Sequence, residues 1–232
     1  MTLKIISWNI WEGKYLFDII DFLKTASADV IGLQEVIQEK GGKANTAQLI
    51  ANELEYEFVY ETDSEIKKDG RRLDKGNAIL SKYKILRNKT YILSETDKRS
   101  AIEADIKVGN TTLHVFNTHL IHTHQKLSDT QNFQAKRLIK VLPEGKIILM
   151  GDFNATPESD VVNNLSHVLK NTDASGAPTW SIYPEGCVGC NPKGVYFKLD
   201  YIFASKDIKS KLFEVGNSKG SDHLPISAII EI

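Results

Sequence analysis

The sequence predicts a single α/β domain in which β-sheets are covered by helices. Segments typical of strands alternate with segments of helical spacing, and several predicted strands follow one another directly. The chain has 232 residues, of which 41% are hydrophobic and 25% are charged. A chain of this length and composition can bury a sizeable core, and no linker, low-complexity tract or repeat divides it. We therefore expect residues 1–232 to form one domain.

The first half of the chain contains three predicted strands and two predicted helices. The helix at 15–26 is indicated by Leu16, Ile19 and Leu23, which recur at helical spacing, and the helix at 45–54 has a candidate cap in Asn45 or Thr46. The predicted strands, which are β-branched or alternate between apolar and polar residues, are 3–10, 29–36 and 57–62. The charged segment 64–76 is expected to be a solvated loop.

Strands dominate the second half. A hairpin turn is expected at Gly109–Asn110, and a helix is expected at 131–142, closed by Pro143 and Gly145. A shorter helix is expected at 160–169. The predicted strands are 77–83, 84–93, 100–108, 111–120, 146–153, 198–205, 211–215 and 225–232.

The charge balance limits the kinds of partner the chain can bind. With 29 basic and 30 acidic residues the net charge is -1, so the chain is not a polybasic nucleic-acid coat protein. A polyanion would have to be met by a local site or by a bound divalent cation. No signal peptide is visible and no apolar run approaches the roughly 20 residues of a membrane span. We expect a cytoplasmic protein without a membrane span, and a monomer.

Two cysteines, Cys187 and Cys190, form a C-x-x-C pattern in a loop rich in glycine and proline. The pattern is half of a zinc ribbon, but a second C-x-x-C is absent. A redox pair would need a helix beginning at the first cysteine, and Gly189, Pro192 and Gly194 argue against one. We interpret the segment as a tight loop with two incidental thiols or a short disulfide, with a metal or redox role as the alternative.

Polar residues recur at the ends of the apolar strands. A buried carboxylate is costly unless it is paired, hydrogen-bonded or metal-bound, so several of them at separate strand ends indicate a shared site. If the strand ends converge, the pocket is rich in oxygen ligands, which suit Mg²⁺ or Mn²⁺ better than zinc. The residues concerned are Asn9, Glu35, His119, Asp152, Asn154, Asp200, Asp222 and His223.

Seven short motifs in a fixed order carry a family resemblance. They are "WNI", "LQEV", "GNAILSK", "FNTHL", "GDFNATP", "LDYIF" and "SDHLP", between residues 7 and 225. Together they resemble the endonuclease/exonuclease/phosphatase superfamily. The resemblance implies a deoxyribonuclease I-like, four-layer α/β sandwich, with two mixed sheets packed face to face and helices outside. It also implies Mg²⁺-dependent hydrolysis of a phosphoester at one edge of the sheets.

The resemblance also implies roles for the metal ligands and the catalytic groups. Glu35 would be the main metal ligand, and Asn9 would hold Glu35 or the water on the metal. Asp222 would be a further metal ligand or would orient a water. Asp152 would act on the attacking water, and Asn154 on a phosphate oxygen.

Further residues would contact the phosphate or support those that do. His223 would contact the scissile phosphate and Asp200 would orient its ring, while His119 would bind a non-bridging oxygen. Arg99 could meet the substrate, although Lys98–Arg99 is also a plausible solvated pair. Asn77, at the start of a strand, could bring backbone near the substrate, although its role would be mainly structural. His122 and His124 are expected in a solvated loop, with a place along the groove as the alternative.

Three functions compete at this point. The first is a nuclease that cleaves DNA or RNA with little sequence preference, and nucleic acid is then the expected substrate. The second is a phosphodiesterase or phosphatase acting on a lipid headgroup or small phosphoester, like a sphingomyelinase or an inositol phosphatase. The third is a binding module without activity, against which the complete set of polar strand-end residues argues. The sequence alone does not choose between one and two metals, or between endo- and exonucleolytic cleavage.

Overall fold

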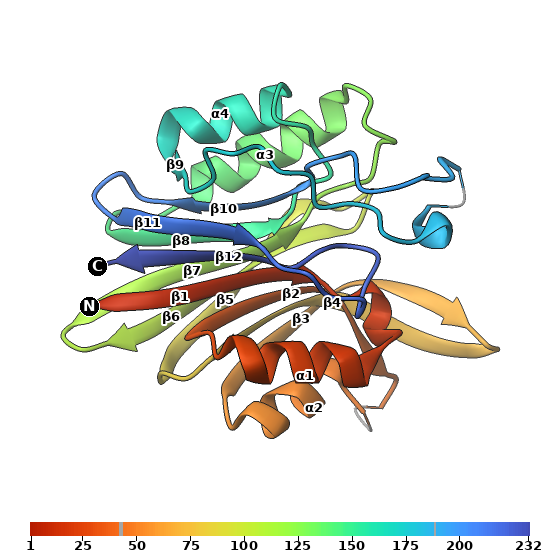
Figure 1. The fold of residues 1–232 in the computed structure, drawn as a ribbon, viewed down its shortest axis with the longest axis horizontal. Coiled ribbons are helices and arrows are strands. Elements are labelled where there is room, and N and C mark those ends of the chain that lie inside the picture. Colours follow the sequence, from red (N-terminus) through yellow and green to blue (C-terminus); the bar gives the residue numbers. More distant parts are fainter. Residues whose placement is uncertain (42–43, 188) are drawn as a thin grey trace.

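Two six-stranded sheets pack face to face, and pairs of helices cover their outer faces (Figure 1). The computed structural model describes residues 1–41, 44–187 and 189–232. In Figure 1 the helices α1 (Leu16–Ala26) and α2 (Thr46–Leu54) lie below the sheets, and α3 (Asp129–Val141) and α4 (Asp160–Val168) lie above them. This arrangement confirms the four-layer sandwich that the sequence predicts.

The first sheet has the strand order β11-β12-β1-β2-β4-β3. Strands β1 and β2 are parallel, and the other neighbours are antiparallel. The bounds of its strands are β1 (Thr2–Asn9), β2 (Val30–Glu39), β3 (Glu57–Lys68), β4 (Arg71–Ser81), β11 (Lys209–Val215) and β12 (Ile226–Glu231).

The second sheet has the order β5-β6-β7-β8-β10-β9, and its one parallel pair is β7 with β8. Each parallel pair is joined through a helix, α1 in the first sheet and α3 in the second. The bounds of its strands are β5 (Ile85–Ser94), β6 (Arg99–Val108), β7 (Thr111–His119), β8 (Lys146–Asp152), β9 (Lys170–Asn171) and β10 (Asp200–Ala204).

The helices α2, α3 and α4 each begin after a residue whose side chain caps the first turn. The Asn45 side chain accepts a hydrogen bond from the backbone N–H of Gln48, which selects Asn45 over Thr46 as the cap. The Ser128 side chain caps the third helix in the same way, by accepting a hydrogen bond from the backbone N–H of Gln131. This helix therefore begins two residues before its predicted start. The helices are α1 (Leu16–Ala26), α2 (Thr46–Leu54), α3 (Asp129–Val141) and α4 (Asp160–Val168), with short 3-10 turns η1 (Trp11–Gly13) and η2 (Pro184–Gly186).

Three apolar clusters separate the layers. The central cluster fills the space between the sheets with side chains such as Leu3, Ile79 and Ile202. The other two lie under the helices: Leu23 and Ile50 pack on the first sheet, and Leu138 and Leu165 pack on the second. Burial of these side chains stabilises each by about 1.5–3 kcal/mol, and it fixes both sheets as rigid supports for the loops at their edges.

The charged segment 64–76 is not a loop, and this prediction was wrong. It forms the end of the antiparallel β3–β4 ribbon, which turns at Asp69–Gly70, and β2 pairs with β4 along this end as far as Leu73. Most of the ribbon faces water, so its side chains are charged and show little apolar alternation. Its ion pairs, such as Lys68 with Glu12 at 2.7 Å, link it to the loop after β1.

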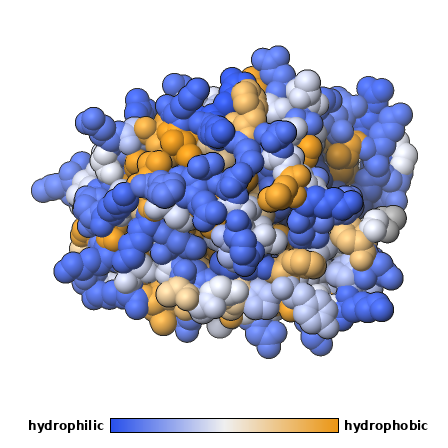
Figure 2. Space-filling view, turned by 90° about the horizontal axis from the view of Figure 1, so that it is seen from above, coloured by the Kyte–Doolittle hydropathy of each residue, from blue (hydrophilic) through white to orange (hydrophobic). Residues whose placement is uncertain are grey.

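The outer face over α3 and α4 is mostly hydrophilic, with hydrophobic residues in separate patches (Figure 2). Exposed apolar side chains of this region include Phe133 and Val168. Among residues 1–41, 44–187 and 189–232, no helix is long and apolar enough to cross a membrane.

Candidate active site

Strand ends from both sheets meet around one cavity of about 400 Å³. Because β1 is parallel to β2 and β7 is parallel to β8, the carboxyl ends of these four strands point to the same edge. The antiparallel strand β10 begins at this edge, where Asp200 pairs with Asp152. The cavity is lined by Asn9, Trp11, Glu12, Glu35, Lys75, Arg99, His119, His122, Asp152, Asn154, Trp180, Glu185, Gly186, Cys187, Asp222 and His223.

The segment Ser221–Pro225 is held against the end of β1. The Ser221 hydroxyl donates to the carbonyl of Asn9 at 2.6 Å, and the Trp8 indole N–H donates to the carbonyl of His223 at 2.9 Å. These bonds join residues more than 200 positions apart in the sequence. They bring an Asp-His pair near the end of the chain into the cavity opened by the first strand.

His223 lies between two buried carboxylates. Its Nδ1 is 2.9 Å from Oδ2 of Asp200, and its Nε2 is 3.6 Å from Oδ2 of Asp152. Burial alone lowers the pKa of His223, but the charges of Asp200, Asp152 and Asp222 outweigh burial and hold the pKa well above its usual value. The raised pKa favours the charged form of the ring, which lines the cavity.

Asp152 is fixed from two directions. The Asn9 amide donates to Oδ2 of Asp152 at 3.0 Å, and the backbone N–H of Asn154 donates to Oδ1 at 2.9 Å. Burial raises the pKa of Asp152, against the opposing charge of His223. The residue before Asp152 has to be a glycine for β8 to lie this close to β7. A Cβ at Gly151 would lie 2.0 Å from the Thr118 carbonyl oxygen of β7. The structure thus places Asn9 on Asp152 rather than on Glu35.

His119 contacts Asn154 at the floor of the cavity. The Asn154 side-chain N–H₂ lies 3.0 Å from Nε2 of His119 and donates to the Leu120 carbonyl at 3.1 Å. Burial lowers the pKa of His119 well below its usual value, and the nearby charges of Arg99 and Lys75 lower it further. The neutral ring can accept the amide hydrogen, so in this state both Asn154 donors are engaged within the protein.

Two further carboxylates, Glu35 and Asp222, line the cavity. Glu35 sits in a β-bulge of β2 with φ of 57°, and its Oε1 is 3.0 Å from Nζ of Lys75. Asp222 accepts a hydrogen bond from the Trp180 indole at 2.9 Å. Burial raises the pKa of Asp222, and the charge of Glu35 raises it further, so the two carboxylates repel each other.

The site has the chemistry to hold a divalent cation. Among the described residues, five carboxylates line the cavity, together with one lysine, Lys75, and one arginine, Arg99. The carboxylates are Glu12, Glu35, Asp152, Glu185 and Asp222. The Lys75 ammonium shows that a positive charge is accommodated beside Glu35. Carboxylate and amide oxygens suit a hard cation, and such an ion would relieve the repulsion between Glu35 and Asp222. Asp152, Asp200 and His223 also have ligand atoms within 4.8 Å of one another.

Arg99 lines the cavity from the start of β6. Its Nε is buried and has no hydrogen-bond partner among the described residues. A buried guanidinium donor without a partner is costly, and an anionic oxygen in the cavity would satisfy it. The geometry therefore favours the substrate contact over the solvated pair for Arg99.

The expectation that Asn77 meets the substrate does not fit the structure. Asn77 is fully buried in β4 and is not part of the cavity wall. Its amide donates to Oδ2 of Asp63 at 2.7 Å, while Ser100 bonds the other oxygen of the same carboxylate. Asn77 is placed this way because β4 is an interior strand, so its side chain supports β3 and β6 from inside.

Sequence reasoning missed a polar clamp between the sheets below the site. The Asn117 side chain, in β7, donates to the backbone carbonyls of Leu33 and Ala78 in the other sheet, at 2.9 and 2.8 Å. Gln34 donates to Oδ1 of Asn117 at 2.6 Å. The signal was present in "LQEV" and "FNTHL", where a buried amide interrupts an apolar strand. Lys75 and Trp180, the partners of Glu35 and Asp222, left no comparable signal.

The loop after β7 meets the cysteine loop at the rim of the cavity. Cys187 and Cys190 are joined by a disulfide, one of the two forms expected of this loop. His122 does not lie in a purely solvated loop, because its Nδ1 is 2.8 Å from Oδ1 of Asn154 and its ring lines the cavity. His124 is exposed, as expected, and lies beside Cys187.

The fold and the site together are those of hydrolases that act on phosphoester bonds. A family model described as the Endonuclease/Exonuclease/phosphatase family matches residues 6–223, and the chain belongs to this family. Its members hydrolyse phosphoester bonds and generally depend on a divalent metal. The resemblance inferred from the seven motifs is thereby confirmed. No curated protein sequence matches the chain.

Solved structures of several proteins share the fold. An endonuclease/exonuclease/phosphatase family protein from Leptotrichia buccalis is 19% identical with a TM-score of 0.79, covering 99% of this chain and 100% of the other. A mannosyl-6-phosphatase from Bacteroides thetaiotaomicron is 17% identical with a TM-score of 0.73 and covers 99% and 100%. D. rerio TDP2, complexed with a single-strand DNA product, is 19% identical with a TM-score of 0.73 and covers 100% and 99%. These likenesses establish the fold, which a sugar-phosphate phosphatase and a DNA-binding protein thus share.

Proposed function

We propose that the chain is a Mg²⁺- or Mn²⁺-dependent phosphodiesterase, specifically a nuclease that cleaves DNA or RNA with little sequence preference. The observation that carries this proposal is the position of His223 and Arg99 on the same cavity as Asp152. Two cationic donors and a fixed carboxylate are what hydrolysis of an anionic ester requires. The excess of carboxylates in the cavity is consistent with a cation that binds together with the phosphate.

Each residue has a proposed part in the reaction. Asp152, held by Asn9 and the Asn154 backbone, accepts a proton from the water whose oxygen forms the new bond to phosphorus. His223 donates to a non-bridging phosphate oxygen, and Asp200 keeps its ring in place. The bond to the leaving oxygen then breaks, and solvent water protonates that oxygen.

Substrate and cation would occupy the remaining groups. Arg99 would bind a phosphate oxygen, and His119 would do so once Asn154 turns toward the substrate. Glu35 and Asp222 would hold the cation, with Asn9 beside them. The bound cation would withdraw charge from the phosphate as a Lewis acid.

The preference for nucleic acid is supported by aromatic side chains at the rim. Trp11 lines the cavity and stacks on Tyr183 with ring centroids 5.5 Å apart and an interplanar angle of 28°. Trp11 and Tyr183 are both only partly buried, and the Lys14 ammonium lies 3.6 Å from the centroid of the Trp11 ring, so an unpaired base would stack on Trp11 by displacing this cation. Single strands and flexible ends would therefore be favoured over intact duplex.

A small phosphoester is the second candidate substrate. A cavity of about 400 Å³ is of the size that binds small molecules, and the acidic side chains Glu12 and Glu185 on its wall would repel a long polyanion. The same site chemistry would then act on a sugar phosphate or a lipid headgroup.

A substrate panel separates the two candidates. Single-stranded DNA, duplex DNA, RNA, a sugar monophosphate, an inositol phosphate and sphingomyelin are compared at one Mg²⁺ concentration and low salt. We expect the highest kcat/KM on single-stranded nucleic acid. A small phosphoester or lipid that exceeds the best nucleic acid by more than about tenfold, a difference of about 1.4 kcal/mol, would reject the nuclease proposal.

A further inference from the structure

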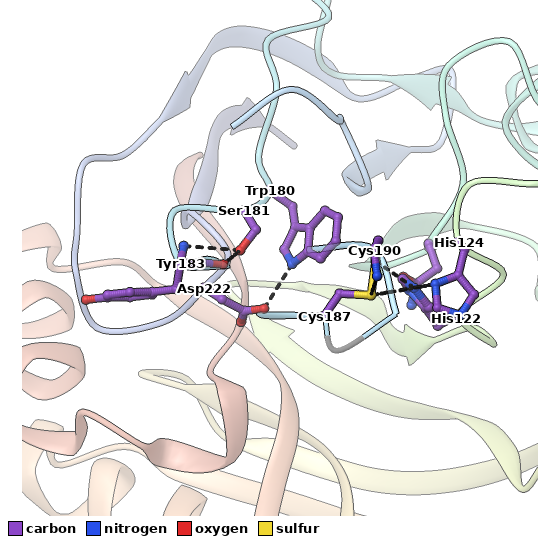
Figure 3. The surroundings of a disulfide bond; sticks show 9 residues. His122, His124, Trp180, Ser181, Tyr183, Cys187, Cys190 and Asp222 are labelled. Atoms are coloured by element: carbon purple, nitrogen blue, oxygen red, sulfur yellow. Dashed lines mark hydrogen bonds between the residues drawn. A yellow bond between two sulfur atoms is a disulfide. The ribbon is translucent and has the colours of Figure 1, made fainter. Parts of the chain in front are cut away.

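Four possible zinc ligands lie together at the rim of the cavity (Figure 3). His122 and His124 come from the loop after β7, and Cys187 and Cys190 come from the loop around η2, more than 60 residues later. One nitrogen of each histidine and the two sulfurs all lie within 4.8 Å of one another. In Figure 3 both imidazole rings stand beside the disulfide.

The distances between these atoms match the edges of a zinc tetrahedron. With Zn–N of about 2.0 Å and Zn–S of about 2.3 Å, the edges are roughly 3.3 Å between nitrogens and roughly 3.5 Å between nitrogen and sulfur. In the structure Nε2 of His122 is 3.3 Å from Nδ1 of His124. The Cys187 sulfur is 3.6 Å from Nδ1 of His124 and 3.9 Å from Nε2 of His122, and the Cys190 sulfur is 4.0 Å from the latter.

We infer that, when the two cysteines are reduced, His122, His124, Cys187 and Cys190 form a Cys₂His₂ zinc site. Two thiolates and two imidazoles form a donor set that zinc prefers over Mg²⁺. Within this set, only the separation of the two sulfurs has to increase substantially, because the disulfide now joins them. The site is separate from the oxygen-rich set around Glu35.

An ordinary thiol reductant is enough to convert the disulfide into the two thiols that zinc would bind. The reductant supplies two electrons and two protons, the S–S bond breaks to give two thiols, and the reductant becomes a disulfide. Zn²⁺ then displaces one proton from each thiol and forms two Zn–S bonds. The zinc-bound form and the disulfide are therefore alternative states of the same loop.

The groups around the ligands fit a metal centre. The backbone N–H of Cys190 donates to the Cys187 sulfur at 3.1 Å, an interaction that stabilises a thiolate. His122 would bind zinc through Nε2, which places its proton on Nδ1. The Nδ1 atom lies 2.8 Å from Oδ1 of the Asn154 side chain. A metal-bound histidine commonly donates its second N–H to an oxygen in this way. The zinc site would thus also hold the Asn154 amide in its observed orientation.

Metal binding to the reduced protein tests this inference. The full chain is reduced with a phosphine, stripped with a chelator and titrated with Zn²⁺ and with Co²⁺ in excess Mg²⁺, which occupies the oxygen-rich site. We expect one Zn²⁺ per chain, and a cobalt spectrum with tetrahedral visible bands and thiolate-to-cobalt charge transfer. Bound zinc should also protect both thiols from alkylation.

Three variants make the test specific. A double variant, Cys187→Ser with Cys190→Ser, should lose the charge-transfer band and the bound zinc. His124→Ala, a change at an exposed ring, should weaken zinc binding by at least about tenfold, the lower end of what even outer-shell changes produce. His167→Ala removes an exposed histidine from α4 and should bind zinc like the wild type.

Two results would overturn the inference. One is zinc bound equally by the wild type and the double serine variant, which would assign the metal to the oxygen-rich site. The other is a reduced wild-type protein that binds no zinc and shows no thiolate band with cobalt while circular dichroism shows it folded. His124→Ala and the double variant are checked by the same spectrum, and His124→Ala decides the matter if the double variant does not fold.

Discussion

The Nδ1 atom of His223 lies 2.9 Å from Oδ2 of Asp200, although the two residues come from different sheets. Asp200 begins β10 in the second sheet, and His223 precedes β12 in the first. Both side chains are almost fully buried. The hydrogen bond therefore links the two sheets at the edge where the site lies. It also orients the imidazole ring of His223.

This pair should act as one unit in catalysis. We expect His223→Ala to lower kcat by at least about 100-fold, because it removes the cation that faces the phosphate. Asp200→Asn should give a smaller loss, since it alters the orientation and charge of His223 without touching the substrate. The double variant should be no slower than His223→Ala alone, as measured by steady-state kinetics.

A control variant and a contradicting result can be stated for the role of the Asp200–His223 pair. Asp207→Asn, at a mostly exposed carboxylate paired with Lys146 at 2.6 Å, should leave kcat unchanged. Additive losses in the double variant would mean that Asp200 and His223 act independently, and the positioning role of Asp200 would have to be given up.

Glu35 should control the cation requirement. Glu35→Gln keeps the size of the side chain but removes the charge that faces the cavity, so we expect the Mg²⁺ concentration for half-maximal activity to rise at least about tenfold. The matched control is Glu39→Gln in the same strand, where the carboxylate is paired with Arg71 away from the cavity. An unchanged Mg²⁺ dependence in Glu35→Gln would remove Glu35 from the metal site.

Part of the site could be predicted because three of its strands are apolar and end in a polar residue. β1 ends at Asn9, β7 at His119 and β8 at Asp152, and each of these lines the cavity. The layer arrangement came from the order of the seven motifs rather than from periodicity. The parallel pairs explain why strand ends far apart in sequence meet at one edge.

Contacts that depend on the register of distant segments could not be predicted. Lys75 reaches Glu35 because β4 pairs with β2 around a bulge, and nothing near Lys75 in the sequence announces this partner. The meeting of "HTH" with "CVGC" is of the same kind, since each segment alone carries only two possible ligands. Asn77 was misjudged because its motif lies at the site in sequence order, whereas its side chain points into the interior.

Trp11 should contribute to binding an unpaired base. Trp11→Leu removes the aromatic face, and we expect KM for single-stranded DNA to rise by the equivalent of about 1–3 kcal/mol, or roughly five- to 150-fold. Trp11→Phe should retain most of the affinity, and turnover of a small alkyl phosphodiester should change little in either variant. Equal effects of Trp11→Leu on both substrates would indicate a structural role and weaken the nucleic-acid proposal.

The carboxylate of Asp63 should make the folded state less stable as the pH rises. Burial raises the pKa of Asp63 from 3.8 to about 6, although hydrogen bonds from Ser100 and Asn77 and the charge of Arg99 oppose this change. The folded chain then holds a proton that the unfolded chain has already lost between about pH 4 and pH 6. The contribution of Asp63 to the free energy of unfolding is fully present below about pH 4, and it is lost as the pH rises through about 6. Two pKa units correspond to about 3 kcal/mol, and we expect about 1–2 kcal/mol because the side chain is partly exposed to solvent.

Asp63→Asn isolates this effect because it keeps the shape of the side chain but cannot ionise. We expect the variant to gain stability relative to the wild type between about pH 5 and about pH 8, as measured by urea unfolding at each pH. Asp69→Asn is the matched control: it changes an exposed aspartate at the turn of the β3–β4 ribbon, where φ is 49° and asparagine is well tolerated. Its unfolding free energy should follow that of the wild type across the whole range. If the difference between Asp63→Asn and the wild type is also independent of pH, Asp63 ionises normally in the folded chain and the raised pKa is wrong.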